Sequence, residues 1–283
     1  WEDSTGQFAH TAAAYIEAFS AVARAPMSKQ IRERGQYGAE RVIDGADNLW
    51  DEDMEAYIMR LTGGEKDHRI DAAALKLTDA FQEYDAIEGI SLTADQVDRL
   101  ADHVSTTLDK LFRNPSHSRV AGLIRYEGDL WRTYEQDGEK VWSVTTAIGA
   151  MAAARGGVML NEHNENGDAY LNRSSDLYEL IADDGPLTSD AGYLAEQAFD
   201  NGDLDSATPL GWSHALRLHA TAMLDDLNAL PTTSSTTEAP DEEPTWTTGE
   251  KDGIGTVADH NATDSSRVWF TLTEGARSEA RVP

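Results

Sequence analysis

Apolar residues recur at helical spacing along most of the first 230 residues. Within 8–25, the residues Phe8, Tyr15, Phe19 and Val22 follow a period close to 3.6. Similar patterns occur in five further segments: 69–84, 93–112, 140–156, 168–185 and 212–230. The fourth of these six segments is apolar nearly all round, which is typical of a helix packed on both sides. No convincing strand alternation precedes residue 250, so the pattern predicts an all-α body with long polar connections.

The pattern changes after residue 230. Ser, Thr, Pro and acidic residues dominate 231–250, a composition typical of an extended or flexible linker. Beyond it, Val268, Phe270 and Leu272 alternate with polar neighbours and precede a Glu-Gly turn, which predicts a β-hairpin. We therefore expect a helical domain over 1–230, a linker over 231–250 and the start of a β domain over 251–283.

Charge narrows the range of partners. The chain has 283 residues with 23 Lys and Arg against 51 Asp and Glu, a formal net charge of −28. Such a charge repels nucleic acid and anionic lipid, and it is typical of a surface solvated at high salt. No apolar run reaches the length that spans a bilayer, so no membrane partner is expected. The absence of Cys excludes disulfides and thiolate chemistry.

The loops carry acidic and aromatic residues together. Hydrolysis of a glycosidic bond needs two carboxyl groups, one to protonate the leaving oxygen and one to activate water. Sugar rings also need flat aromatic surfaces and side chains that bind hydroxyl groups. This mixture occurs in four loop segments: 1–3, 125–131, 195–197 and 210–214.

Two of these segments carry motifs of a known family. Residues 194–218, LAEQAFDNGDLDSATPLGWSHALRL, resemble the signature near the end of the catalytic domain in glucoamylases and their relatives of glycoside hydrolase family 15. The resemblance implies that Glu196 is the general base and that Gln197 and Trp212 contact substrate. Trp1-Glu2-Asp3, before an Ala-rich helix, is similar to the family's Trp-Glu-Glu motif, which implies that Glu2 is the general acid and Trp1 a pocket wall.

Two further segments extend the resemblance. Arg125-Tyr126-Glu127-Gly128-Asp129 is similar to a family loop whose Arg and Asp hold sugar hydroxyls, which implies that Arg125 and Asp129 bind substrate. Residues 253–283 resemble the opening of the N-terminal β-sandwich of prokaryotic members. The resemblance implies the C-terminal half of an (α/α)6 toroid, followed by the first hairpin of a second β-sandwich. The chain opens without Met and within a motif, so we expect it to belong to a longer polypeptide.

The expected function is an inverting, exo-acting hydrolase that releases glucose from the non-reducing ends of α-glucans. The resemblance implies no cofactor and no metal, and its partners are an α-glucan and the remainder of the polypeptide. Trehalose, isomaltose and dextran remain open as substrates, and so does the protein's location. A different class also remains open, a non-catalytic carbohydrate-binding or structural unit, because Asp3 and His68 depart from the family pattern.

Each assigned residue also has a plainer interpretation. Glu196 is then a solvated carboxylate at a helix end, and Glu2 an acidic residue favoured by the dipole of the helix that follows. Arg125 and Asp129 are then a surface ion pair of little energetic consequence. Trp212 is then a core residue or an anchor at a helix start.

Overall fold

Helices dominate the part of the chain that the structure describes. The computed structural model describes residues 5–114, 120–131 and 135–231, and the backbone of three later strands, 246–250, 256–260 and 270–271. The chain divides into a unit formed by Trp1–Ser189 and Tyr193–Pro231 and a unit formed by Asp190–Gly192 and Thr232–Pro283. Each unit is described by itself.

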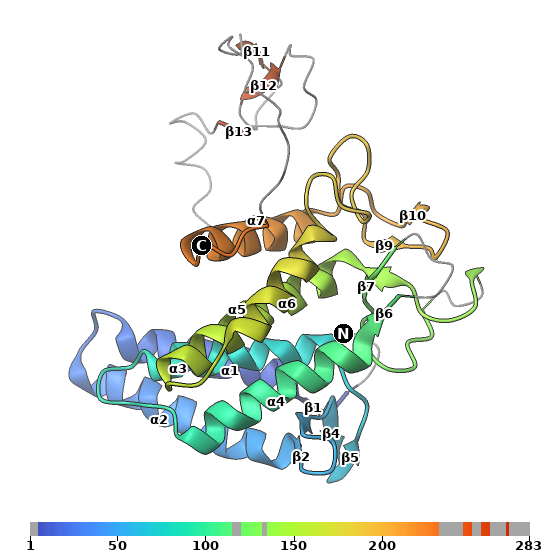
Figure 1. Ribbon diagram of the computed structural model, residues 1–283. Helices are drawn as coiled ribbons and strands as arrows, with labels where there is room; N and C mark the ends of the chain where they lie inside the picture. The colour runs from blue at the N-terminus through green and yellow to red at the C-terminus, as the bar shows by residue number, and fades with distance from the viewer. Residues whose placement is uncertain are drawn as a thin grey trace. The chain divides into compact units, whose positions relative to one another are not determined.

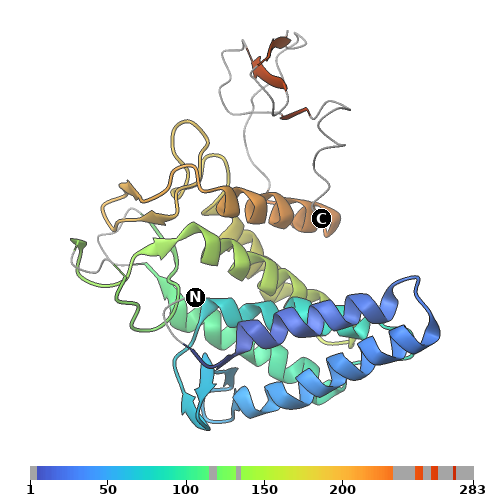
Figure 2. The same ribbon diagram turned by 180° about the vertical axis from the view of Figure 1, so that it is seen from behind.

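The helices of the first unit form two layers (Figure 1). One layer is a row in which each helix packs against the next, in the order α1 (Ala9–Arg24), α3 (Lys76–Asp85), α5 (Ser143–Glu162) and α7 (Gly211–Asp226). The other layer covers this row and consists of α2 (Lys29–Ala46), α4 (Ala94–Leu111) and α6 (Asp168–Glu179). Seen from behind, the four helices of the row begin at the same end of the unit (Figure 2).

Helix α2 was not predicted from the sequence. Its mean hydropathy is low, and two glycines interrupt its apolar stripe. Both glycines are needed because α1 lies very close: a Cβ at Gly35 would lie 2.8 Å from the Phe19 carbonyl oxygen, and one at Gly38 would lie 2.7 Å from the Phe19 ring. The tight α1–α2 contact therefore requires residues that weaken the helical pattern.

Three predicted helices have clearly different bounds in the structure. The helix predicted over 140–156 spans Ser143–Glu162. The segment 69–84 begins as extended chain, and Asp71 then caps the 3₁₀ helix η2 (Ala72–Leu75) by accepting a hydrogen bond from the Ala73 amide. The helix predicted to reach residue 185 ends at Glu179. Helix α4 begins with a capping box formed by Thr93 and Gln96.

Helix α5 is the core helix of the unit. It packs against α3, α4, α6 and α7, and most of its residues are buried. Contrary to the sequence analysis, Ser143–Glu162 is long and apolar enough to cross a membrane by length and composition, but 89% of that window is buried inside the protein. The buried core helix of a protein also meets these criteria of length and composition. The apolar character of α5 is explained by its packing against helices on both sides.

Short strands join the loops at the ends where the row begins, although no strand was predicted there. They form four antiparallel groups, β1–β4–β5, β2–β3, β6–β7 and β8–β9–β10. Their bounds are β1 Gln7–Phe8, β2 Trp50–Asp51, β3 Ala56–Tyr57, β4 Arg60–Thr62, β5 Glu65–Asp67, β6 Phe112–Arg113, β7 Gly122–Leu123, β8 Val141–Trp142, β9 Gln197–Ala198 and β10 Leu204–Asp205. Strands of two or three residues are too short to produce a detectable alternation.

In the second unit, the described backbone forms an antiparallel sheet. Its order is β11 (Trp246–Glu250), β12 (Thr256–His260) and β13 (Phe270–Thr271). Strand β11 lies within the segment that composition assigns to the linker. The predicted turn at 274–275 lies outside the described residues.

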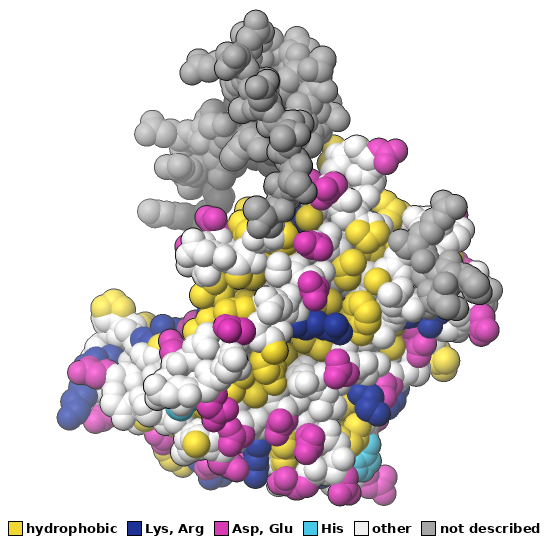
Figure 3. Space-filling view, viewed as in Figure 1, with side chains coloured by type: hydrophobic (Ala, Val, Ile, Leu, Met, Phe, Trp, Pro, Cys, Tyr) yellow, Lys and Arg dark blue, Asp and Glu magenta, His cyan; other side chains and the backbone are white. Residues whose placement is uncertain are grey.

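Large apolar side chains are exposed at both ends of the helical row. Tyr15 and Tyr37, on α1 and α2, are 56% and 63% exposed, and Trp212 and Leu218, on α7, are 52% and 71% exposed. Carboxylates are scattered over the face drawn in Figure 3, with apolar patches between them. The row therefore has two apolar edges, one along α1 and α2 and one along α7.

Candidate functional site

The loops before the four helices of the row are joined by backbone hydrogen bonds. Three bonds connect segments that are distant in sequence: Ala9 N to Met59 O at 3.2 Å, Ala72 N to Arg125 O at 2.8 Å, and Ser143 N to Glu196 O at 3.2 Å. A fourth, Leu210 N to Leu194 O at 3.0 Å, closes the loop between α6 and α7. The loops thus form one connected rim at the N-terminal ends of the helices. Three of the predicted site segments, 125–131, 195–197 and 210–214, lie on this rim.

Arg125 and Asp129 form a buried pair on the rim. Nε and Nη2 of Arg125 donate to the two carboxylate oxygens of Asp129, each at 2.7 Å. The residues are only 7% and 3% exposed, so the interpretation as a surface ion pair is wrong. The turn between them is closed by the Asp129 amide, which donates to the Tyr126 carbonyl at 3.2 Å, and Gly128 supplies its left-handed residue with φ of 71°.

Trp142 links this pair to the segment of Glu196. The guanidinium carbon of Arg125 lies 4.5 Å from the centroid of the Trp142 ring, a cation–π contact. In the sheet β8–β9–β10, Trp142 lies opposite Gln197, and Gln197 lies opposite Asp205. Directly opposite residues project from the same face of a sheet, so these three side chains share a face.

Glu196 immediately precedes β9 and carries a partly buried carboxylate. Its Oε2 accepts a hydrogen bond from the Ser206 hydroxyl. Its backbone is held on both sides, since the Glu196 amide donates to Ala207 O at 2.9 Å and its carbonyl accepts from the Ser143 amide. Because α6 ends at Glu179 and α7 begins at Gly211, the interpretation of Glu196 as a helix-end carboxylate is wrong.

Gln197 has a buried amide group without a partner. The residue is 1% exposed, and neither Oε1 nor Nε2 finds a hydrogen-bond partner among the described residues. Buried polar atoms are nearly always paired, and an unpaired one costs about 1–3 kcal/mol. An unpaired buried amide on the rim is a group that hydrogen bonds from a polar ligand would satisfy.

Trp212 lies in the first turn of α7 and is 52% exposed, so it is not a core residue. Two residues later, His214 Nε2 accepts a hydrogen bond from the Leu194 amide at 3.0 Å. Burial, with the neighbouring Arg217, lowers the pKa of His214. This imidazole therefore acts as a neutral brace between α7 and the rim.

The remaining predicted residues are Trp1 and Glu2, which lie outside the described residues. The pairing of Glu2 with Glu196 therefore stays a prediction. Among the described residues, no group of three or more His, Asp or Glu side chains is arranged to hold a metal ion.

Three rim residues were not predicted from the sequence: Lys140, Trp142 and Ser206. Lys140 is 2% exposed, and its ammonium group contacts the carboxylates of Glu135 and Asp205. Trp142 reads in the sequence as an apolar residue at the start of a helix, and Ser206 as an ordinary turn residue. No local pattern in the sequence indicated that Lys140 is buried.

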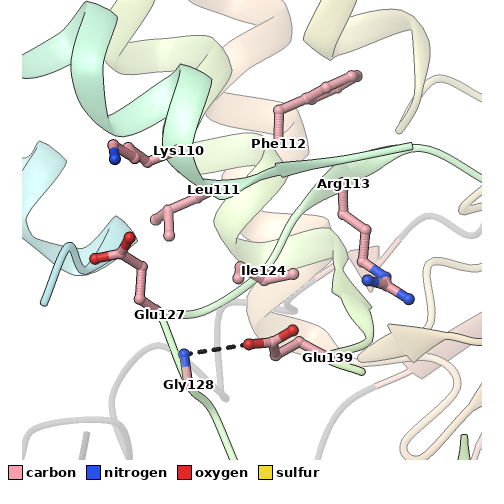
Figure 4. A pocket seen from close by; sticks show the side chains of 8 residues that line it. All are labelled: Lys110, Leu111, Phe112, Arg113, Ile124, Glu127, Gly128 and Glu139. Carbon is pink, nitrogen blue, oxygen red and sulfur yellow. Dashed lines mark hydrogen bonds between the residues drawn. The ribbon is translucent and has the colours of Figure 1, made fainter. Parts of the chain in front are cut away.

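A pocket of about 360 Å³ lies beside the turn that carries Arg125 and Asp129. Figure 4 shows Glu127 and Glu139 flanking Gly128 in its lining. Both carboxylates are engaged by backbone amides: Glu127 accepts from Ile70 at 2.9 Å, and Glu139 accepts from Gly128 at 3.1 Å. They fix the turn from outside.

Known proteins resemble both parts of the chain. A family model described as "Glucodextranase, domain N" matches residues 236–283. The structure is similar to the crystal structure of a D-mannose isomerase, with TM-score 0.55 and 14% identity over 78% of this chain. It is also similar to a glucoamylase from Saccharomycopsis fibuligera, with TM-score 0.53 and 16% identity over 82% of this chain. A bacterial glucoamylase complexed with acarbose matches with TM-score 0.50 and 16% identity, again over 82% of this chain.

The chain covers 54%, 58% and 36% of the isomerase, the yeast glucoamylase and the bacterial glucoamylase, respectively. None of the curated proteins compared matches the sequence. At these identities the structural matches establish the fold alone, and that fold is shared by hydrolases and an isomerase.

The described helical unit thus has a glucoamylase-type helical fold. Residues 236–283 match the family model of the glucodextranase N domain, and the helical unit is similar in fold to two glucoamylases, in agreement with the resemblance seen in the motifs.

Proposed function

We propose that this chain contributes the general base and most of the substrate contacts of an inverting glucan hydrolase. Glu196 removes a proton from a water molecule, and Glu2 protonates the glycosidic oxygen from the other side. Inversion requires about 6.5–9.5 Å between the two carboxyl groups to leave room for that water. The products are glucose, released from the non-reducing end, and a shortened α-glucan.

One observation carries the proposal: on the rim, the Ser206 hydroxyl holds the carboxylate of Glu196, and the next residue in the chain, Gln197, has a buried amide without a partner among the described residues. The hydroxyl of Ser206 and the two backbone bonds fix the direction of the carboxylate before substrate arrives, as general base catalysis requires. Hydroxyl groups of a sugar both donate and accept, so one hydroxyl-rich ring can satisfy both atoms of the Gln197 amide.

The other proposed contacts follow from the rim. Asp129 and Arg125 bind hydroxyls of the terminal sugar from a rigid buried pair, so little side-chain entropy is lost on binding. Trp1 and Trp212 form walls of the pocket, and Trp212 has an exposed ring suited to the CH face of a sugar. No cofactor or metal takes part in this chemistry.

The finer architecture is also a proposal. We propose that the helical row is an arc of an (α/α)6 toroid and that further helices of the same polypeptide cover its two apolar edges at α1–α2 and α7. The exposure of Tyr37 and Leu218 supports this proposal. Composition gives limits of 1–230, 231–250 and 251–283 for the helical domain, the linker and the β domain. We propose that β11, Trp246–Glu250, belongs to the β domain, so that the linker ends before it.

The test is Glu196→Gln in the full-length polypeptide, with Glu162→Gln as control at the far end of α5. The first variant keeps the shape of the side chain and cannot accept a proton, so glucose release from maltooligosaccharides falls by about 10²–10⁴-fold. The control retains the wild-type rate. Nuclear magnetic resonance of the first product identifies the anomer, and an inverting reaction on an α-linkage gives the β-anomer.

Other results would contradict the proposal in distinct ways. Full glucose release by Glu196→Gln excludes Glu196 as the base. Calorimetric binding of oligosaccharide without turnover by the wild type supports the non-catalytic alternative. Maltose, trehalose, isomaltose and dextran, assayed together, identify the linkage that the site accepts.

A further inference from the structure

Lys140 carries a buried positive charge that the proposed reaction does not use. Its side chain is 1% exposed. The ammonium group donates to Asp205 Oδ2 at 2.7 Å and to Glu135, and its nitrogen lies 4.0 Å from the centroid of the Phe199 ring. A buried ammonium group is costly unless carboxylates or aromatic faces replace its hydrating water, so the charge of Lys140 depends on these contacts.

The contacts of Lys140 lead directly to the proposed general base. Asp205 is the last residue of β10, and the next residue, Ser206, donates to the Glu196 carboxylate. Ser206 has φ of 65°, a left-handed conformation that is unfavourable for a side chain with a Cβ and persists only where its surroundings hold it. The residue that follows, Ala207, accepts the hydrogen bond from the Glu196 amide.

Lys140 is also near in sequence to Ser143, which holds the backbone of Glu196. It directly precedes β8, which pairs with β9, and Ser143 after β8 donates to the Glu196 carbonyl. The Lys140–Asp205 bond therefore spans the two outer strands of the sheet whose middle strand follows Glu196.

We propose that Lys140 is a positioning residue for Glu196. Its ammonium group fixes Asp205, Asp205 fixes the left-handed turn at Ser206, and Ser206 orients the carboxylate toward the attacking water. Lys140 itself touches neither substrate nor water in the reaction. This inference rests on the proposed function and deepens it, since it explains how the base is oriented before substrate binds.

A second ion pair provides a matched control. Arg113 Nη2 binds Asp200 Oδ2 at 2.7 Å, and Gln136 also contacts Asp200. This pair joins the same two loops as Lys140–Asp205 does, but its carboxylate lies in the turn between β9 and β10. Among the described residues, Glu196 is hydrogen-bonded to Ser143, Ser206 and Ala207. Neither Arg113 nor Asp200 takes part in these hydrogen bonds.

The experiment compares Lys140→Met, Lys140→Arg and Arg113→Met in the full-length polypeptide. Lys140→Met lowers kcat by about ten- to a hundredfold with a smaller change in KM, because a misplaced base slows the reaction more than it weakens binding. In its rate–pH profile, the acidic limb also moves to higher pH than in the wild type. Lys140→Arg restores most of the rate, and Arg113→Met keeps the wild-type profile even where its thermal midpoint falls.

Equal profiles for Lys140→Met and Arg113→Met would overturn the inference, since Lys140 would then only stabilise the loops. If Lys140→Met does not fold, Asp205→Asn breaks the same link while Glu135 still pairs with Lys140, and it is read in the same way. A wild type without glucan hydrolysis refutes the proposed function instead. In that case a carbon-13 titration of the Glu196 carboxyl decides the inference, which fails if the curves of wild type and Lys140→Met coincide.

Discussion

The side chain of His103, on α4, is a fully buried titratable group. It is 0% exposed, and its Nδ1 accepts a hydrogen bond from the Tyr57 amide at 3.2 Å. A ring nitrogen that accepts this bond cannot carry a proton, so the folded protein holds the neutral imidazole. Burial accordingly lowers the pKa of His103 to about 4, against an ordinary value of 6.5.

This shift predicts a loss of stability in mild acid. Between pH 6.5 and 4 the unfolded chain binds a proton at His103 and the folded chain does not, so the free energy of unfolding decreases as pH falls. The contribution of this residue is complete above pH 6.5, and about 3 kcal/mol of it is lost by pH 4. Urea unfolding at pH 7.5, 6, 5 and 4 measures the effect.

The variant His103→Gln isolates that contribution. Its amide oxygen can accept the Tyr57 bond and does not titrate, so the variant has a smaller pH dependence in this window. An imidazole proton resonance of His103 that titrates above pH 6 in the folded protein would contradict the prediction.

Single residues of the site differed in how far the sequence revealed them. The motifs placed Arg125, Asp129, Glu196 and Gln197 on loops, and the structure connects these loops in one rim. Lys140 and Ser206 were not found, because their roles depend on partners 65 and 10 residues away, with no local pattern to indicate them.

Helix α5 and the start of α6 approach each other closely through two glycines. A Cβ at Gly167, which caps α6, would lie 2.0 Å from the carbonyl oxygen of Gly157 in α5. The atoms that this Cβ would meet all belong to the backbone of Gly157, so no side-chain rotation relieves the overlap. Glycine at this position is therefore a condition for the packing of the two helices.

The expected result is a strong difference between two Gly→Ala substitutions. Gly167→Ala lowers the free energy of unfolding by at least about 2 kcal/mol, because α6 must move away from α5. Gly45→Ala, where no atom lies within 4 Å of the added Cβ, leaves stability unchanged or raises it by up to about 1 kcal/mol. Thermal unfolding followed by circular dichroism compares them, and equal midpoints would exclude the backbone clash.

Helix prediction succeeded where apolar spacing was regular and failed where packing required small residues. Six helices were expected from their apolar patterns, and each has a counterpart in the structure. Helix α2 was missed because Gly35 and Gly38 serve its contact with α1. The short strands were missed because each consists of only two or three residues, too few to show an alternation.

The whole chain carries a large excess of negative charge. With 51 acidic and 23 basic side chains, repulsive pairs outnumber attractive ones. The ion pairs at the surface are worth little individually and are screened by salt. The net effect of salt is therefore decided by relief of repulsion, which acts over about 10 Å at 0.1 M salt and about 3 Å at 1 M.

Salt should accordingly stabilise the fold. We expect the midpoint of thermal unfolding to rise between 0.1 M and 1 M NaCl, and to rise equally in KCl, since screening depends on ionic strength. Glucose-free sucrose solutions of matched osmolality separate screening from a general solute effect. A midpoint that falls or stays constant with NaCl would show that the attractive pairs outweigh the net repulsion.

The residue pattern alone was sufficient for the mainly helical class of the described part of the first 230 residues and for the segments that meet on the rim, 125–131, 195–197 and 210–214. These features are local or additive, so spacing, composition and motif reveal them without knowledge of distant contacts. Folding was needed to bury Arg125 with Asp129, to leave the Gln197 amide without a partner, and to bring Lys140 and Ser206 to Glu196. Burial and hydrogen-bond partners depend on which distant segments pack together, and no local pattern carries that information.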